Sequence, residues 1–159
     1  MNEKKILLAQ AIVLLGGTVF SWYHLLPMVS RFQSVYGTLF HFVGCTVPNP
    51  FLTPCLYGSV AFLIALLWSM SMYRYPGHAR ERRLRNFLLF CVAFGVVAVS
   101  YETAQFYHVI GGYSVSCDPG ASPFATPCFF GTFFYIGAYV IAIVAARRLK
   151  PVISAPSAV

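Results

Sequence analysis

Apolar residues in this chain are gathered into four long stretches, and the segments between them hold most of the charge and proline. The stretches cover residues 6–28, 54–73, 86–108 and 127–146. Each approaches or exceeds the roughly 20 apolar residues that a helix needs to cross the hydrocarbon core of a bilayer. The pattern predicts an all-α integral membrane protein, built as a bundle of four transmembrane helices.

The first stretch is longer than the apolar region of a cleavable signal peptide and carries Trp22, Tyr23 and His24 toward its far end. No small-residue cleavage pattern follows it, so we expect a retained first span. Composition agrees with this interpretation. The chain is 58% hydrophobic, only 9% charged, and has a mean hydropathy of +0.71, which is too little charge to cover the surface of a soluble domain of this length.

Basic residues predict the orientation of the spans. Ten of the eleven Lys and Arg residues fall on one side of the predicted membrane, and only Arg31 falls on the other. The ten are Lys4, Lys5, Arg74, Arg80, Arg82, Arg83, Arg85, Arg147, Arg148 and Lys150. By the positive-inside rule both termini are expected in the cytoplasm, with the protein in a bacterial cytoplasmic (inner) membrane. The charge flanks membrane spans, so the lipid bilayer is the expected partner and nucleic acid is not.

A nine-residue motif, Pro-Phe-x-Thr-Pro-Cys-x-x-Gly, occurs at residues 50–58 and again, 73 positions later, at 123–131. Each copy opens one of the apolar stretches. Because each repeated unit contains an even number of spans, both copies should face the same, outward side. Gly58 and Gly131 end the two copies, and small residues at such positions favour close helix packing in lipid.

The duplication predicts a single membrane domain, 1–159, made of two tandem helical hairpins. The first hairpin is expected to cover 1–73 and the second 86–146. A basic cytoplasmic loop should join them at 74–85. The segment 151–159, which is rich in Pro, Ser and Ala, is expected to be disordered.

Four of the five cysteines belong to the outward loops: Cys45 and Cys55 in the first, Cys117 and Cys128 in the second. A disulfide within each loop is the simplest pairing, although four cysteines allow three connectivities. Such bridges can simply staple the loops, and chain-entropy arguments give each about 2–3 kcal/mol. The fifth, Cys91, lies inside the third stretch and is expected to be a small buried packing residue.

Thiol–disulfide exchange is the functional alternative to stapling. Cys55 and Cys128 each follow a proline at the predicted start of a helix. There, unpaired amide groups and the positive end of the helix dipole stabilise a thiolate, the reactive form of cysteine. Cys45 and Cys117 are then the exposed partners. Two such pairs could pass electrons from an outside protein to a lipid-soluble acceptor.

Four spans, cytoplasmic termini, two outward cysteine pairs and an apolar segment in the first loop at residues 35–43 together resemble the DsbB and vitamin K epoxide reductase class of membrane thiol oxidoreductases. The resemblance lies in topology and cysteine placement over most of the chain. It implies electron exchange between an extracytoplasmic thioredoxin-like protein and a quinone.

Glu102 is the single acidic residue expected inside a span. An ionisable group at that depth is costly unless it is paired, hydrated or neutral, so it is a candidate functional residue by default. It could accept protons beside a quinone, pair with Arg31, or bind a cation. It could also be a hydrogen-bonded packing residue that faces Gln105 or a tyrosine hydroxyl.

His24 and His108 lie near the outer ends of the first and third stretches and are the candidate cofactor-binding residues. Together they could also ligate a haem or a metal. No spacing of histidine or cysteine here matches a metal signature, so we expect no metal site.

These observations favour a membrane thiol–disulfide oxidoreductase with a quinone as electron acceptor. Its catalytic residues would be Cys45, Cys55, Cys117, Cys128 and Glu102. The alternative is a non-catalytic accessory or scaffold subunit of a larger membrane complex. In that case the other membrane subunits are its partners, and the disulfides staple its outer loops.

Overall fold

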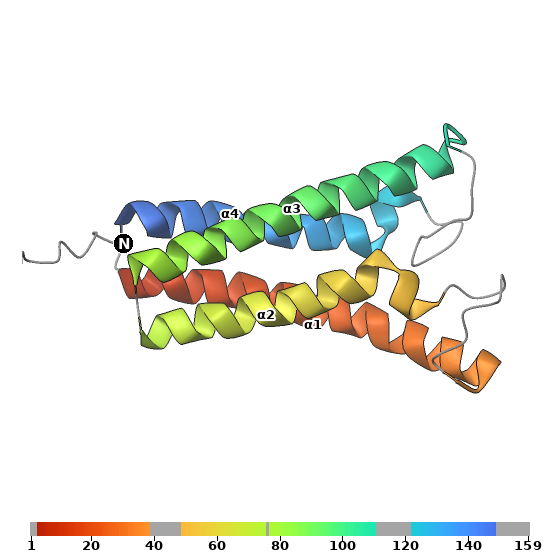
Figure 1. Ribbon diagram of the computed structural model, residues 1–159, viewed down its shortest axis with the longest axis horizontal. Helices are drawn as coiled ribbons and strands as arrows, with labels where there is room; N and C mark the ends of the chain where they lie inside the picture. The colour runs from red at the N-terminus through yellow and green to blue at the C-terminus, as the bar shows by residue number, and fades with distance from the viewer. Residues whose placement is uncertain (1–2, 39–48, 76, 111–121, 149–159) are drawn as a thin grey trace, which may run out of the picture.

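The computed structural model describes residues 3–38, 49–75, 77–110 and 122–148, and all regular structure in these ranges is helical (Figure 1). Four long helices are present: α1 (Glu3–Tyr36), α2 (Pro54–Arg74), α3 (His78–Phe106) and α4 (Pro127–Arg148). Short 3₁₀ helices, η1 (Pro50–Leu52) and η2 (Pro123–Ala125), precede α2 and α4. All four long helices have the length and composition needed to cross a membrane. The expected all-α class with four candidate spans is therefore confirmed.

The four helices run side by side along the long axis of the molecule (Figure 1). Helix α1 packs against α2 and α4, and α3 packs against α4 and α2. The starts of α2 and α4 lie at the same end of the bundle, so both copies of the repeat are found there. We call this the cysteine end. The opposite, basic end holds the starts of α1 and α3 and the ends of α2 and α4, and with them every described Lys and Arg except Arg31.

Two helices are longer than the apolar pattern predicted. The segment 74–85, expected as a loop, is mostly helical, since α2 runs to Arg74 and α3 begins at His78. Arginine and leucine are good helix formers, so the charged residues before position 86 continue the helix although they do not belong to the apolar stretch. Helix α1 has 34 residues, about 51 Å at 1.5 Å per residue, and continues past the apolar stretch because Phe32 is buried. Most of 35–43 and all of 151–159 lie outside the described residues.

Close packing of the bundle depends on Gly17 and Gly95, and not on the two glycines that end the repeated motif. A Cβ atom on Gly17 of α1 would overlap the ring of Phe62, and one on Gly95 of α3 would lie 2.5 Å from Thr132 Oγ1. A Cβ on Gly58 would meet nothing within 4 Å, and one on Gly131 would make only an ordinary contact, 3.8 Å from Phe62. The expectation that Gly58 and Gly131 permit close helix contact is therefore wrong.

Candidate functional site

Both copies of the repeat fold in the same way. In each, Pro-Phe-x forms a 3₁₀ turn, and the hydroxyl of the following threonine donates a hydrogen bond to the first carbonyl of that turn. Thr53 Oγ1 donates to the Pro50 carbonyl at 2.8 Å, and Thr126 Oγ1 donates to the Pro123 carbonyl at 2.9 Å. A proline then occupies the first helical position, where its missing N–H costs nothing and its fixed φ suits a helix. The motif therefore starts a helix in both places.

This start makes Cys55 and Cys128 the second residues of α2 and α4, as the sequence predicted. The equivalence extends beyond the nine-residue motif. Ser59 donates to the carbonyl of Cys55, and Thr132 donates to the carbonyl of Cys128, each at 2.8 Å. Both cysteines are therefore held in the first turn by hydroxyl groups one turn further along the helix.

The two helix-start cysteines lie against each other. Cys55 Sγ and Cys128 Sγ are 3.5 Å apart, although the residues are separated by 73 positions. Cys55 is disulfide-bonded, and Cys128 carries a thiol. Cys45 and Cys117, expected as their partners, lie outside the described residues. A disulfide sulfur and a thiol sulfur are therefore in van der Waals contact at the cysteine end.

Glu102 lies beside this pair of sulfurs. Its side chain is buried, with an exposed fraction of 4%, and Oε2 lies 3.1 Å from Thr126 Oγ1, whose one proton is shared between this carboxyl oxygen and the Pro123 carbonyl. The carboxyl group also interacts with the side chain of Cys128. Arg31, a suggested partner, is exposed on α1. The carboxyl group is therefore associated with the second copy of the repeat through a threonine and a cysteine.

A cavity of about 260 Å³ opens between the four helices at this end. Both motif cysteines and both motif glycines lie in its wall. The other lining residues come from every helix: Ser21, His24, Leu25 and Met28 from α1; Pro54, Ser59 and Phe62 from α2; Cys91, Phe94, Gly95 and Ala98 from α3; and Ala125, Pro127, Thr132 and Tyr135 from η2 and α4. This cavity explains why a Cβ on Gly58 would meet nothing within 4 Å, since Gly58 lies in the cavity wall.

An aromatic pair closes the inner end of the cavity. Phe62 and Tyr135 are related by the same 73-residue offset as the cysteines, and their rings stack at 3.8 Å with an interplanar angle of 7°. The Tyr135 hydroxyl donates to the carbonyl of Gly58 at 2.8 Å and also interacts with Cys91. Cys91 is buried, as expected, but it also lies in the cavity wall.

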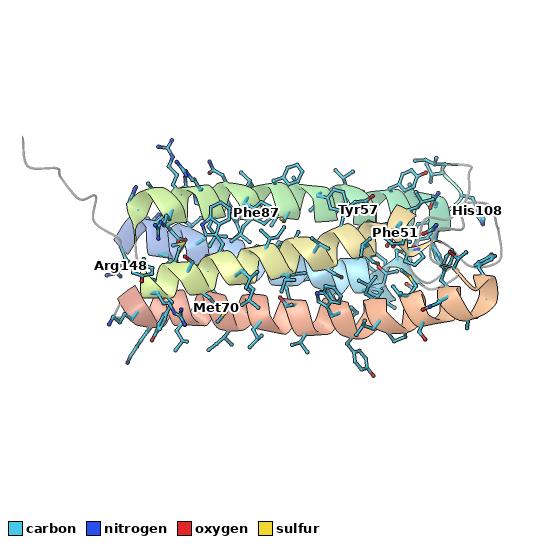
Figure 2. The ribbon with its side chains drawn as sticks, turned by 60° about the horizontal axis from the view of Figure 1, so that its bottom comes forward. Phe51, Tyr57, Met70, Phe87, His108 and Arg148 are labelled. Carbon is cyan, nitrogen blue, oxygen red and sulfur yellow. The ribbon has the colours of Figure 1, made fainter. Side chains whose placement is uncertain are left out.

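The two histidines that were candidate cofactor-binding residues are in different surroundings. His24 lines the cavity and packs against Phe20, with ring centroids 4.7 Å apart. His108 is exposed beyond the end of α3, at the same end as Phe51 (Figure 2), but it is not part of the cavity wall. Within the described residues, no group of three or more His, Cys, Asp or Glu side chains is placed to hold a metal ion.

Several members of this site were not identified from the sequence: Thr126, the stacked pair Phe62 and Tyr135, and the cavity position of Cys91. The aromatic pair could have been found from the sequence, because Phe62 and Tyr135 are separated by the same 73 positions as the two motif cysteines. Comparisons with protein-family models, with curated proteins and with solved structures found no match.

Proposed function

We propose that this protein is a membrane thiol–disulfide oxidoreductase that exchanges electrons between an extracytoplasmic thioredoxin-like protein and a quinone in the bilayer. The observation that carries this proposal is the 3.5 Å contact between Cys55 Sγ and Cys128 Sγ, with one sulfur in a disulfide and the other a thiol. Staples for two separate loops have no need of such contact, whereas exchange between two cysteine pairs requires it.

The exchange step is a displacement at sulfur. Cys128 gives its proton to Glu102, and the resulting thiolate attacks Cys55 Sγ. A Cys55–Cys128 disulfide forms, the existing bond to Cys55 breaks, and the sulfur released from it leaves as a thiolate. Both motif cysteines lie in the first turn of a helix, where backbone amides stabilise negative charge on sulfur. This step replaces the disulfide of the first pair by one that joins the two pairs, without net oxidation.

Net turnover needs a two-electron acceptor and a two-electron donor. A dithiol in the thioredoxin-like protein loses two electrons and two protons as it becomes a disulfide. A bound quinone would accept two electrons and two protons and become a quinol. The cavity supports this assignment because an apolar cavity of about 150 Å³ is enough to bind benzene, and this one is larger. Cys55, Cys128, Phe62 and Tyr135, which line the cavity, would be the residues that hold a quinone ring there.

The two halves of the site differ in a way that suits a relay. Glu102 lies seven residues after the close-contact glycine Gly95, and His24 lies seven residues after the close-contact glycine Gly17. The second half therefore presents a buried carboxyl group where the first presents an imidazole on the cavity wall. Because different polar groups lie in the two halves of the site, the two pairs are expected to differ in potential. Electrons can then move in one direction.

The proposal includes the topology that the basic residues favour. The basic end faces the cytoplasm of a bacterial inner membrane, both termini lie on that side, and the two hairpins are tandem copies of one unit. The cysteine end then faces outward, where disulfides persist.

Formation of a disulfide between the two motif cysteines tests this proposal. With Cys45 and Cys117 replaced by Ser, both Cys55 and Cys128 should carry thiols, and an S–S bond of about 2.05 Å needs the sulfurs to approach by only about 1.5 Å. Added quinone should generate the Cys55–Cys128 bond, detected by mass spectrometry of the linked peptides. Cys91→Ala is the matched control and should leave the bond intact. Absence of the bond would favour the accessory subunit with stapled loops.

A further inference from the structure

A second group of buried polar side chains lies toward the basic end, away from the cysteines. Gln10 of α1, Ser69 of α2 and Glu81 of α3 each have an exposed fraction of 0%. Their neighbours along the core are apolar and include Leu14, Met72 and Leu84. Two amide atoms, one hydroxyl and two carboxyl oxygens are thus placed inside an otherwise apolar part of the bundle.

The three side chains occupy neighbouring levels of the bundle. Gln10 and Glu81 interact across the core, although α1 and α3 are not neighbouring helices. The position of Ser69 at the same level as Gln10 follows from the register of α1 against α2. These helices are antiparallel, and Gly17 meets Phe62; two turns toward the basic end, α1 reaches Gln10 and α2 reaches Ser69.

None of these polar atoms has a hydrogen-bond partner among the described residues: Gln10 Oε1 and Nε2, Ser69 Oγ, and Glu81 Oε1 and Oε2. Gln10 nevertheless lies close enough to Glu81 to interact with its carboxyl group. Buried polar groups in proteins are normally bonded, and groups that are not usually surround a water molecule or an ion. An ionisable side chain inside a membrane span is also a functional candidate by default.

We propose that Gln10, Ser69 and Glu81 form a hydrated binding site for one monovalent cation, a proton or a sodium ion. Carboxylate, amide carbonyl and hydroxyl oxygens are ligands suited to a small hard cation. A single positive charge neutralises the single carboxylate in an apolar core, whereas a divalent ion would leave excess charge there. The Gln10 amide is compatible with either cation, since it can donate a hydrogen bond to a carboxylate or accept one from a protonated carboxyl group.

Arg85 is the charged residue that acts on Glu81, from one turn further along α3. It is only half-buried and makes no hydrogen bond to either carboxyl oxygen of Glu81, so it does not take the place of a bound cation. The other described basic side chains at this end are exposed: Lys4, Lys5, Arg74, Arg80, Arg82, Arg83, Arg147 and Arg148. They face the surroundings of the bundle and not its core.

This site is independent of the proposed redox chemistry. Buried Leu84 and Leu88 lie between Glu81 and the cavity residue Cys91 along α3, a separation of about 15 Å at 1.5 Å per residue. Loss of cation binding would therefore leave the sulfur contact unaffected, and loss of thiol exchange would leave the cation site unaffected.

Thermal unfolding of the full chain in nanodiscs tests the sodium arm. Sodium chloride replaces choline chloride at constant ionic strength, and the midpoint is followed for the wild type, Glu81→Gln and the matched control Glu102→Gln. Sodium at ten times its dissociation constant should raise the midpoint by about 3–6 °C in the wild type and the control. Glu81→Gln should remove the dependence.

Infrared difference spectra between acidic and alkaline buffers test the proton arm. A carboxylic acid band that is missing from Glu81→Gln and retained in Glu102→Gln would assign the cation as a proton. Gln10→Leu should shift this band or weaken the sodium response. If Glu81→Gln matches the wild type in both its sodium response and its infrared spectrum, the proposal is wrong.

Discussion

Substituting alanine at two glycines, Gly17 and Gly58, should change stability in opposite directions. At Gly17 the new Cβ would overlap Phe62 Cε1 and lie 2.9 Å from Cδ1 and Cζ of the same ring. The ring has little room to move because Phe62 has an exposed fraction of 1% and is stacked on Tyr135. At Gly58 the new Cβ would meet nothing within 4 Å, because the cavity begins there.

The magnitudes follow from these surroundings. Overpacking a well-filled core costs about 1–3 kcal/mol, so Gly17→Ala should lower the free energy of unfolding by that amount. Alanine is favoured over glycine inside a helix by about 0.5–1 kcal/mol, so Gly58→Ala should raise it. The two variants should therefore differ by about 1.5–4 kcal/mol, which for a chain of this length is about 3–16 °C in the unfolding midpoint.

Unfolding of both variants in the same detergent, followed by tryptophan fluorescence against temperature and denaturant, gives the comparison. Gly95→Ala serves as a second crowded position, since its Cβ would lie 2.5 Å from Thr132 Oγ1. Equal stability of Gly17→Ala and Gly58→Ala would refute the reasoning. It would mean that the close contact of α1 with α2, or the open space beside Gly58, is wrongly placed.

Further outcomes follow from the hydrogen bonds of the site. Glu102→Gln should slow the single-turnover reaction of Cys128 with a disulfide probe by about 10²–10⁴-fold, because the proton acceptor is lost, while Glu81→Gln at the other end should leave the rate unchanged. Tyr135→Phe should lower the free energy of unfolding by about 0.5–1.5 kcal/mol in denaturant titrations, because the hydrogen bond to the Gly58 carbonyl is removed. A Glu102→Gln rate equal to that of the wild type would exclude the carboxyl group as the base.

The sequence was sufficient for the helices and for the placement of the two motif cysteines at helix starts. Long apolar stretches and the Thr-Pro pair act locally, so their effect can be recognised without a structure. The basic segment after Arg74 was wrongly expected as a loop, because hydropathy reports membrane depth and says nothing of where a helix ends. Arginine-rich segments continue a helix well outside the hydrocarbon.

The contacts inside the site could not be predicted in the same way. Sequence proximity suggested pairing within each loop, but the contact between Cys55 and Cys128 depends on how α2 and α4 lie together in space. For the same reason a partner for Glu102 was sought in Arg31, Gln105 or a tyrosine, whereas Thr126 and Cys128 interact with its carboxyl group. The repeat offset is the exception, because it relates residues that meet across the centre of the bundle.

The reduction potentials of the cysteine pairs in native membranes distinguish redox-active disulfides from structural ones. Membranes are equilibrated in defined thiol buffers, alkylated, and analysed by mass spectrometry, with and without added quinone. We expect two different potentials, at least one of them between about −100 and −250 mV, and reoxidation by the quinone. Two matched potentials below about −300 mV, insensitive to quinone, would contradict this expectation and identify the bridges as structural staples.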